Sequence, residues 1–486
     1  MTSSSVRVTL VRQSFRDIYT LFDEVEDREI RPPEGLLYVA AALEDRGHQV
    51  TVIDNEVLGL NDDELLNKIA HTQPEMVGMG ATTPEFPRIA NLLNIIHNEL
   101  GAVTVLGGPH GSAISENIIS SNPGIYYVVR GEGEITTVEL VESLKNGVPP
   151  ESLPGLAFRR NGEVVLTPDR PLISDLDKLP WPARHLLDSH EYRYPSRGRG
   201  MQEVATMITS RGCPYSCIFC YSMHGHQVRY RSVDSVINEV ESVINDYGIR
   251  YIIFHDECFT LSKKRVLNFC DEVLRKQLDI RWFCFTRGDT IDEEMAERMA
   301  AAGCVKISLG VESGSQEMLD RSGKRTRLDK IDRAFRILDK AGIETRGSFI
   351  VGLPGENRQS LQNTVDFAKS LKMYHFGLNI ATPYPGTKMW QMAEKGDGIR
   401  FENMDFSAFR RWGNAVVATD GLEAHDLVQA QRKALIQFYL RPKILWFFLR
   451  EYLRGNRSAY YHRPLKFAIK EAWHNFSAGI FRDSSV

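Results

Sequence analysis

The sequence predicts an α/β protein with two sheet-containing domains, and three observations lead to that prediction. Short apolar runs alternate with helix-like apolar patterns in two series, one before residue 150 and one after residue 203. Strands alternating with helices form parallel sheets covered by helices. A proline-rich stretch separates the series, and an aromatic, basic segment follows them. We expect a flavodoxin-like (Rossmann-type) parallel sheet domain at 1–148, a connector at 149–200, a partial (β/α)6 barrel at 201–425 and a C-terminal helical extension at 426–486.

The first series contains five short apolar runs with strand character. The expected strands are Arg7–Val11, Val50–Ile53, Met76–Gly80, Val103–Leu106 and Tyr126–Val129. The expected helices between them, which repeat apolar residues on one face, are Gly35–Arg46, about Arg88–Glu99 and Thr136–Leu144. Ligands of such sheets bind beyond the carboxyl ends of the strands.

Glycine-rich loops occupy those ends: Gly80-Ala-Thr-Thr-Pro84, Gly107-Gly-Pro-His110 and Gly131-Glu-Gly-Glu134. Glycine lets the backbone approach a ligand closely, but ordinary turn chemistry also explains these glycines and is favoured when the loops are taken alone. None of the loops has the spacing of a dinucleotide fingerprint, which argues against NAD.

The connector is broken up by prolines, which prevents any long element there. A hairpin is expected where Gly155–Arg159 and Val164–Leu166 flank Asn161-Gly162, a strong turn pair.

The second series predicts six β/α units. Its expected strands are Val204–Ile208, Tyr251–Phe254, Trp282–Phe285, Val305–Leu309, Ser348–Val351 and Phe376–Ile380. Its expected helices are Val233–Asp246, Lys263–Gln277, Asp292–Ala302, Leu328–Ala341 and Asn357–Leu371. The chemistry of a β/α barrel sits at the carboxyl ends of its strands.

Composition narrows the class of protein. The chain has 59 Lys or Arg against 63 Asp or Glu, a net charge of −4, which gives no reason to expect a nucleic-acid partner. All seven cysteines lie between Cys213 and Cys304, and an odd, small number argues against a disulfide framework.

Three of these cysteines follow the first barrel strand, in Ser210-Arg-Gly-Cys213-Pro-Tyr-Ser-Cys217-Ile-Phe-Cys220. Thiolates at this spacing suit an iron–sulfur cluster, or zinc with His224 or His226 as a fourth ligand. Chance clustering is the third interpretation. The place at the end of a barrel strand favours a cluster.

The cysteine loop, with Phe219 before its last cysteine, resembles the cluster motif of the radical S-adenosylmethionine superfamily. Later segments extend the resemblance: Phe254-His-Asp-Glu-Cys-Phe-Thr260, Ser308-Leu-Gly-Val-Glu-Ser-Gly-Ser315, Phe349-Ile-Val-Gly-Leu-Pro-Gly-Glu356 and Pro383-Tyr-Pro-Gly-Thr387. It implies a 4Fe-4S cluster on Cys213, Cys217 and Cys220 whose open iron binds S-adenosylmethionine, which reduction would cleave to a 5′-deoxyadenosyl radical.

The resemblance also implies contacts to S-adenosylmethionine. The expected residues are Phe219, Asp256, Glu257, Glu312, Gly352 and Pro354. Two alternatives stay open: Asp256 and Glu257 as acidic residues at a helix start, and Gly352 with Pro354 as a tight turn. No catalytic residue is assigned.

The N-terminal half resembles the cobalamin-binding domain of the cobalamin-dependent branch of this superfamily, through Pro33-Glu-Gly-Leu-Leu-Tyr-Val-Ala-Ala-Ala-Leu43 and the glycine loops. The cobalamin contacts that it implies are Thr82, Thr83, Gly107, Gly108, Pro109, His110, Gly131, Glu132 and Gly133. One departure is the missing Asp-x-His-x-x-Gly motif, which in other cobalamin proteins supplies a histidine ligand to cobalt.

The cysteine positions also separate subfamilies. Methylthiotransferases carry N-terminal cluster cysteines, and this chain has none before Cys213; auxiliary C-terminal clusters need cysteines that do not follow Cys304. The resemblance implies methylation of an unactivated carbon of a small-molecule substrate, with an external flavodoxin- or ferredoxin-type reductant. A cyclase or rearrangement enzyme acting on a tetrapyrrole or lipid-type substrate without methyl transfer, and a non-catalytic cobalamin or cluster sensor, stay open as alternatives.

The tail is basic, with 11 Lys or Arg against 3 Asp or Glu from Gln431 to Val486. Phe438–Leu453 is rich in aromatic residues and arginine, so it is either an interfacial helix on an acidic membrane or a helix that caps the open side of the barrel. Without an apolar signal core or an 18-residue apolar run, we expect a cytoplasmic protein, peripheral to the membrane if the tail binds lipid.

Overall fold

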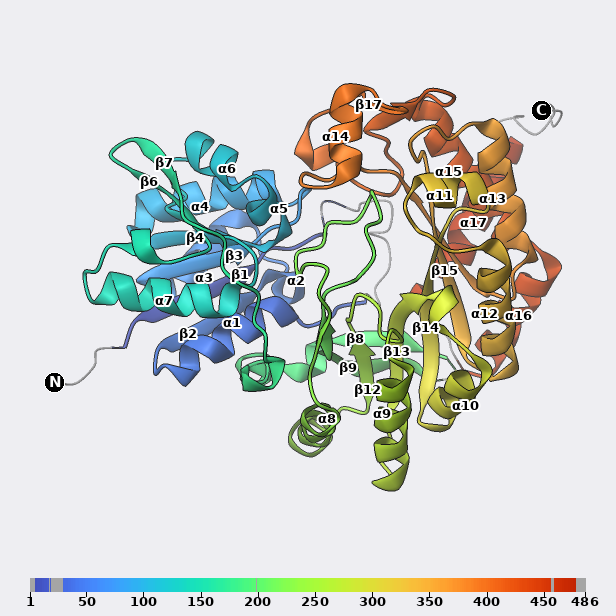
Figure 1. Cartoon of the computed structure of the whole chain (residues 1–486), viewed down its shortest axis with the longest axis horizontal. Coiled ribbons are helices and arrows are strands. Elements are labelled where there is room, and N and C mark those ends of the chain that lie inside the picture. Colours follow the sequence, from blue (N-terminus) through green and yellow to red (C-terminus); the bar gives the residue numbers. More distant parts are fainter. Residues whose placement is uncertain (1–4, 17, 19–28, 198, 456–458, 478–486) are drawn as a thin grey trace.

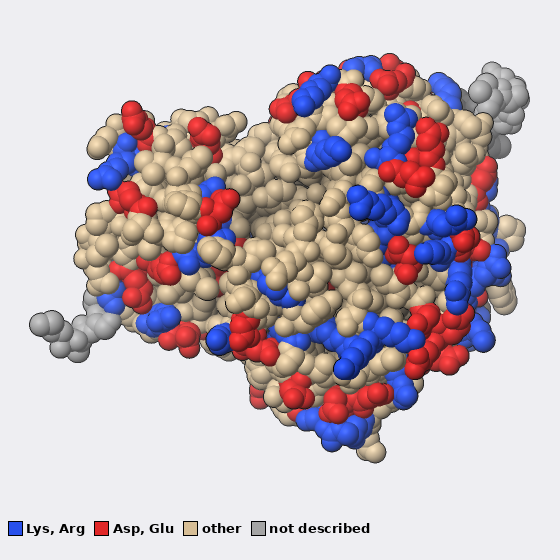
Figure 2. Space-filling view, in the orientation of Figure 1, with Lys and Arg blue, Asp and Glu red and all other residues tan. Residues whose placement is uncertain are grey.

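A computed structural model describes residues 5–16, 18, 29–197, 199–455 and 459–477. Figure 1 shows two sheet-containing lobes side by side, the N-terminal lobe on the left and the barrel lobe on the right, with the cysteine-bearing segment between them. The surface is hollowed between the lobes, and charged side chains gather around the hollow rather than in it (Figure 2). The α/β fold expected from the sequence is confirmed.

The N-terminal lobe is built on a seven-stranded sheet with the order β2-β1-β3-β4-β5-β6-β7. Its strands are β1 (Arg7–Arg12), β2 (Gln49–Asp54), β3 (Met76–Gly80), β4 (Val103–Gly107), β5 (Tyr127–Val129), β6 (Leu156–Arg160) and β7 (Glu163–Leu166). The first five are parallel, and their order is the flavodoxin-like one.

Helices cover both faces of this sheet. They are α1 (Glu34–Asp45), α2 (Asn55–Leu58), α3 (Asp62–His71), α4 (Phe86–Leu100), α5 (Gly108–Ala113), α6 (Ser115–Ser121) and α7 (Gly133–Lys145). The helix α3 was absent from the sequence-based expectation, since its charged first turn leaves only Leu65 and Ile69 buried.

The expected hairpin forms, but it belongs to the N-terminal sheet. Strand β6 pairs antiparallel with β5, placing Phe158 opposite Tyr127, and β7 extends the edge. The first part of the proline-rich stretch is therefore packed structure.

The barrel lobe contains a curled seven-stranded sheet with the order β16-β15-β14-β13-β12-β9-β8. Its strands are β8 (Arg193–Ser196), β9 (Gly200–Met207), β12 (Tyr251–Phe254), β13 (Arg281–Arg287), β14 (Cys304–Glu312), β15 (Glu344–Val351) and β16 (His375–Ile380). Six of these strands run parallel, as expected: β9, β12, β13, β14, β15 and β16. Strand β8 adds an antiparallel edge.

Side-chain alternation gives this sheet a packed outer face and a more open inner face. The helices outside are α8 (Val233–Tyr247), α9 (Lys263–Arg275), α10 (Glu293–Ala301), α11 (Gln316–Arg321), α12 (Leu328–Lys340) and α13 (Arg358–Ser370). On β15, Phe349 and Val351 are buried in the outer core, whereas Arg346, Ser348 and Ile350 retain exposure. Inward side chains of this strand therefore border open space.

After the barrel, the described part of the chain forms a small antiparallel pair of strands and four helices. They are α14 (Lys388–Lys395), β17 (Ile399–Phe401), β18 (Val417–Thr419), α15 (Ala424–Tyr439), α16 (Pro442–Leu453) and α17 (Ala459–Ser477). Helix α15 packs on the edge strand β16, where the Tyr439 hydroxyl accepts from Phe376 N at 2.9 Å and donates to Phe376 O at 3.0 Å. Helix α15 therefore caps the open edge.

Helix α16 begins at Pro442, so the aromatic segment is divided between two helices. Its inner face buries Phe447, Phe448 and Glu451, while Trp446 is 62% exposed and Leu453 is 72% exposed. Trp473 of α17 is also 72% exposed. Within the described part of the chain, no helix has the length and apolar character needed to cross a bilayer.

Candidate active site

The cysteine loop leaves the sheet just after β9, between the short strands β10 (Ser210–Arg211) and β11 (Arg229–Tyr230). Gly212 opens it with a φ of +94°, and a Cβ there would meet Gln227 O at 2.3 Å. Backbone hydrogen bonds fix its far side, since Ile218 N donates to Ser322 O at 3.0 Å and Met389 N donates to Ile218 O at 2.8 Å. Two separate segments of the barrel therefore hold the loop.

The three loop cysteines differ from the other four, which are buried. Loss of hydration raises the pKa of the Cys220 thiol to about 12, and the charges of Cys217 and Cys213 raise it further. No three His, Cys, Asp or Glu side chains of the described residues are already gathered as a metal site. The three thiols on one anchored loop are nevertheless the donor set that suits an iron–sulfur cluster.

Charged residues surround this loop. Lys324 Nζ lies 2.8 Å from Glu312 Oε1, and both side chains are buried. Glu312 has a φ of +70°, a strained conformation for a residue with a side chain and typical of functional sites. Arg287 pairs with Asp289 at 2.8 Å and stacks on the Tyr215 ring with 3.6 Å from Cζ to the centroid.

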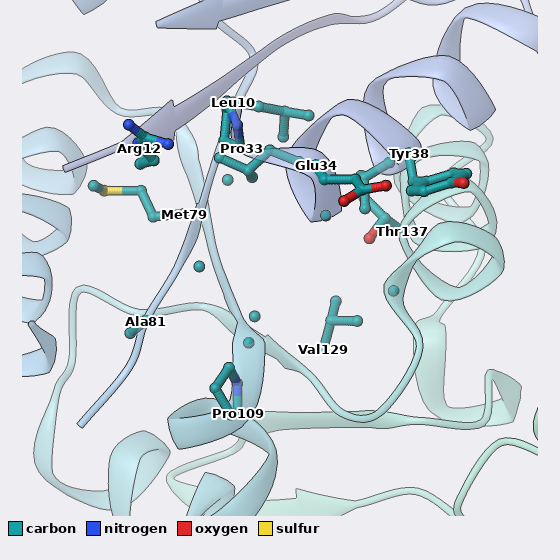
Figure 3. Close-up of a pocket in the computed structure, with 18 of the residues that line it drawn as sticks. Leu10, Arg12, Pro33, Glu34, Tyr38, Met79, Ala81, Pro109, Val129 and Thr137 are labelled. Atoms are coloured by element: carbon teal, nitrogen blue, oxygen red, sulfur yellow. The ribbon is translucent and has the colours of Figure 1, made fainter. Parts of the chain in front are cut away.

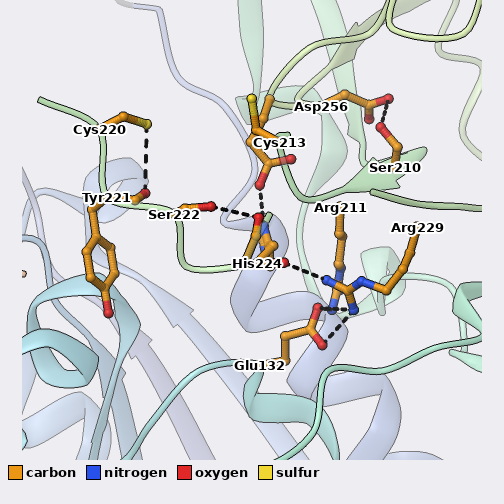
Figure 4. Close-up of polar contacts among 12 residues, drawn as sticks. Glu132, Ser210, Arg211, Cys213, Cys220, Tyr221, Ser222, His224, Arg229 and Asp256 are labelled. Atoms are coloured by element: carbon orange, nitrogen blue, oxygen red, sulfur yellow. Dashed lines mark hydrogen bonds and ion pairs between the residues drawn. The ribbon is translucent and has the colours of Figure 1, made fainter. Parts of the chain in front are cut away.

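Asp256 faces the base of the cysteine loop. Its carboxylate accepts a hydrogen bond from Thr209 N at 2.6 Å. It accepts another from Ser210 Oγ at 2.8 Å (Figure 4). Its neighbour Glu257 lies 2.6 Å from His224 Nδ1. Asp256 therefore holds the segment before the three cysteines, and Glu257 contacts the segment after them.

The loop that follows β15 contains a tight turn near the cysteine loop. Gly352 has a φ of +85°, and its N–H donates to the fully buried carboxyl of Glu356. Burial raises the pKa of Glu356 to about 7. Pro354 follows in the same turn, and Phe219 packs half-buried against the barrel core.

A cleft of about 510 Å³ lies at the carboxyl ends of β3 and β4 and against the N-terminal end of α1 (Figure 3). Seven of the residues predicted to bind cobalamin line it: Thr82, Gly107, Gly108, Pro109, Gly131, Glu132 and Gly133. Around the Cβ position of Gly80 or Gly131 there is open space. These glycines shape a wide, largely apolar cradle that side chains would fill, and this suits a flat, bulky ligand.

The two other predicted residues lie behind the cleft wall. His110 Nδ1 is 3.1 Å from Thr83 Oγ1, and the His110 ring packs on Phe86 with 4.4 Å between centroids. Burial lowers the pKa of His110 to about 4, so the ring is neutral at pH 7. Neither side chain is among those lining the cleft.

The barrel supplies the opposite wall of the same cleft. Met223 and His224, which closely follow Cys220, line it together with Arg211 and His255. His255 Nδ1 is 3.1 Å from Glu34 Oε2, a contact between the two lobes. The residues that flank the three cysteines in the sequence therefore border the cleft.

A buried ion-pair network joins the lobes beside this site (Figure 4). Glu132 Oε1 lies 3.1 Å from Arg211 and 2.9 Å from Arg229, and Glu134 lies 2.5 Å from Arg211. Burial alone would raise the pKa of Glu132, but the hydrogen bonds from Arg229 and Ile173 and the charge of Arg211 outweigh burial and lower it. The carboxylate of Glu132 thus binds arginine.

Sequence reasoning missed most of these partners. Arg211, Arg229 and Lys324 carry no motif of their own, and their partners are distant in the sequence or across a turn. The one available signal was the position of Arg211, two residues before Cys213.

Comparisons with known proteins agree with this architecture. The B12 binding domain model matches residues 28–141 and the Radical SAM superfamily model matches residues 207–368. An uncharacterized methyltransferase of Pyrococcus horikoshii is 34% identical over 443 residues, which span 88% of this chain and 94% of the relative. An anaerobic magnesium-protoporphyrin IX monomethyl ester cyclase of Rubrivivax gelatinosus is 29% identical over 85% of this chain and 75% of the relative.

Two solved structures share the fold. The radical S-adenosylmethionine methyltransferase TsrM of Kitasatospora setae, solved with cobalamin and a [4Fe-4S] cluster, superposes with a TM-score of 0.68 at 22% identity, over 90% of each chain. The cobalamin-dependent S-adenosylmethionine radical enzyme OxsB, with aqua-cobalamin bound, gives a TM-score of 0.72 at 17% identity, over 99% of this chain and 82% of that chain. With both domain models matched in order and a full-length relative 34% identical, this chain belongs to the family of cobalamin-dependent radical S-adenosylmethionine enzymes.

Proposed function

We propose that the chain is a C-methyltransferase acting on an unactivated carbon of a small molecule. Its family uses a 4Fe-4S cluster, S-adenosylmethionine and cobalamin. The observation that carries the proposal is the shared cleft, in which Met223 and His224 of the cysteine loop face the glycine cradle of the N-terminal lobe. A cofactor that donates a methyl group and the site that generates a substrate radical must meet in one protected volume.

In this proposal Cys213, Cys217 and Cys220 bind the cluster. When bound, the cluster supplies the electron that cleaves S-adenosylmethionine and so generates the radical that activates the substrate. The chain's part is to hold the loop still, through Gly212, Ser322 and Met389, and to keep water out.

The residues proposed to bind S-adenosylmethionine fall into two groups. Glu312, Gly352, Pro354 and Phe219 lie on strand ends and loops around the cysteines, where a carboxylate and a close backbone approach can receive the amino group and the adenine. Asp256 and Glu257 are engaged with Thr209, Ser210 and His224. We assign to them the positioning of the loop as well as any contact to the nucleoside.

The cleft between the lobes is proposed to bind cobalamin. The seven lining residues form its contact surface, while Thr83 and His110 support the wall from behind. The chain would bind, orient and shield the cofactor there, which carries the methyl group between donor and substrate.

Further parts of the proposal concern partners and domains. We propose the limits 1–148, 149–200, 201–425 and 426–486 for the four regions, with the hairpin β6–β7 of the connector adding two strands to the N-terminal sheet. We also propose an external flavodoxin- or ferredoxin-type protein as the one-electron reductant. We also propose that the exposed face of α16 and α17 contacts an anionic membrane surface, because Trp446, Leu453 and Trp473 stand beside basic residues there.

The runner-up is ring closure or rearrangement without methyl transfer, favoured by the cyclase relative at 29% identity. A non-catalytic cobalamin or cluster sensor is the alternative from another class. Reconstituted anaerobic protein given reductant, S-adenosylmethionine and candidate substrates separates the three. Deoxyadenosine with S-adenosylhomocysteine supports methylation, deoxyadenosine alone supports cyclisation, and neither product from a cluster- and cobalamin-loaded protein supports a sensor.

A further inference from the structure

The inner face of the half-barrel borders a second cavity, of about 350 Å³, which shares no lining residue with the cleft between the lobes. Strands β14, β15 and β16 provide one wall, and α15 and α17 provide the other. Neither the cysteine loop nor the glycine loops contribute to it. Its lining is unusual for a barrel interior because it is both cationic and aromatic.

Arg346 stands in the middle of the basic lining, projecting inward from β15. Its guanidinium occupies space left by Gly377 on the neighbouring strand, where a Cβ would come within 3.0 Å of Arg346 Nη2. The carboxylate of Glu344, two residues before Arg346 on β15, is shared by Lys306 at 3.4 Å and His375 at 2.9 Å. Among the ion pairs of the described residues, none involves Arg346.

Basic side chains outnumber acidic ones in the lining of this cavity. Lys306, Arg411 and Arg463 line it with Arg346, and the acidic Glu29 at its rim is paired with Arg31. The pKa of the Tyr194 phenol responds to the same positive charges. Burial alone would raise this pKa, but the charges of Lys306, Arg31 and Arg346 lower it. A lining with more basic than acidic side chains favours anions.

The cavity extends toward the candidate active site. Strand register pairs Arg346 with His375, the first residue of β16, and pairs Val351 with Ile380, the last. Ile380 N donates to Arg411 O at 2.9 Å, so the backbone of Arg411 lies level with the C-terminal end of β16. Five residues of strand separate these levels, about 16 Å. Gly352, proposed to contact S-adenosylmethionine, follows Val351 directly.

We propose that this cavity binds an oxyanion, carboxylate or phosphate, carried by the substrate, with Arg346 as its central ligand and Arg463 as a second. The inference rests on the proposed function, which it deepens by naming the chemical class of the substrate. The substrate is then an elongated anion, its charged end at Arg346 and its reacting carbon at the C-terminal edge of the strands. Tyr194 and Trp412 line the cavity and provide flat surfaces for an apolar body.

The site also gives the basic tail a role. Arg463 belongs to α17 and Tyr439 to α15, so the C-terminal extension completes the wall opposite the sheet. Bidentate binding by arginine favours planar carboxylates and phosphates over other anions.

Calorimetric titration of the anaerobic holoprotein with inorganic phosphate and, separately, with glutarate tests the proposal. We expect saturable binding of at least one probe, and the preferred probe identifies the source of the oxyanion. R346Q and R463Q should each weaken that binding at least tenfold, with R346K closer to wild type. The control R333Q, on the exposed face of α12, should bind as wild type does.

Absence of binding of both probes to the wild-type protein overturns the proposal, as does unchanged affinity in R346Q. If R346Q does not fold, R463Q decides the question alone. Deoxyadenosine formation by the wild-type protein is measured in parallel without substrate. If the wild-type protein forms no deoxyadenosine but still binds the anion, the proposed function is wrong and the assignment of the cavity as an anion site is unaffected.

Discussion

Arg211 and Glu134 form a buried ion pair, with 2.5 Å between Nη2 and Oε1, that ties the base of the cysteine loop to the first turn of α7. Both side chains are almost fully buried. Arg211 is two residues before Cys213, and Glu134 closes the Gly131-Glu-Gly-Glu134 loop that borders the cleft. The pair therefore couples the position of the cluster loop to the shape of the proposed cobalamin site.

Breaking this pair should be costly. Arg211→Met leaves Glu134 buried without its partner and removes one of the two arginines on Glu132, so we expect the free energy of unfolding to fall by about 3 kcal/mol. Adding Glu134→Gln to the same variant should recover part of this loss, because it removes the unpaired charge. Denaturant unfolding of the three proteins measures both effects. Arg321→Met, which breaks an exposed pair with Glu317, is the control and should change stability by less than about 1 kcal/mol.

The alternation of strands and helices could be predicted from the sequence because it depends on short-range periodicity. Strands β3 and β12 match the expected bounds residue for residue. The predicted fifth barrel strand began at Ser348, whereas β15 begins at Glu344, since Glu344 and Arg346 face the inside of the barrel and break the apolar pattern. Polar residues inside a barrel resemble a loop when only the sequence is read.

The cysteines and glycine loops could likewise be identified from local spacing. Arg211 and Glu134, in contrast, are 77 positions apart, and Arg229 and Glu132 are 97 apart. Such pairs depend on how the two lobes meet, which no local pattern encodes. For the same reason the inner cavity, whose lining spans residues from Glu29 to Phe467, stayed hidden.

The cleft should lose cobalamin when its floor is filled. Around the Cβ position of Gly80 no atom lies within 4 Å, so Gly80→Val fits the fold and projects into the cleft. We expect a cobalamin dissociation constant at least tenfold higher, measured by absorbance titration, with an unchanged melting temperature of the cobalamin-free protein. If this variant bound cobalamin with wild-type affinity, the assignment of the cleft as the cobalamin site would be wrong.

Glu356 should make stability depend on pH. Burial raises the pKa of its carboxyl from 4.5 to about 7 in the native state. Between these pH values the native protein binds more protons than the unfolded chain, so the free energy of unfolding falls as pH rises, by about 3 kcal/mol in total. Glu356→Gln removes this dependence.

The melting temperature of Glu356→Gln should therefore rise relative to wild type as pH increases from 5 to about 7.5. Differential scanning fluorimetry across this range measures the difference. The exposed Glu317→Gln serves as the control, and parallel pH profiles for wild type and Glu356→Gln would contradict the prediction.

The exposed aromatic face of the tail should bind anionic vesicles. Replacing Trp446 and Trp473 by alanine removes two large apolar side chains, each contributing about 2 kcal/mol when buried. We expect co-sedimentation with phosphatidylserine-containing vesicles to drop at least tenfold, and wild-type binding to weaken at high salt. Trp181→Ala, at another exposed tryptophan, is the control. Equal pelleting of all three proteins would exclude the membrane contact.

The most direct test of the account combines cofactor content with S-adenosylmethionine cleavage in one anaerobic preparation. We predict about four iron atoms per chain, bound cobalamin, and deoxyadenosine formation that requires reductant. Alanine at Cys213, Cys217 or Cys220 should abolish iron binding and deoxyadenosine together, whereas alanine at the buried Cys270 should preserve both. Zinc in place of iron, or deoxyadenosine formation that survives loss of the loop cysteines, would contradict the account.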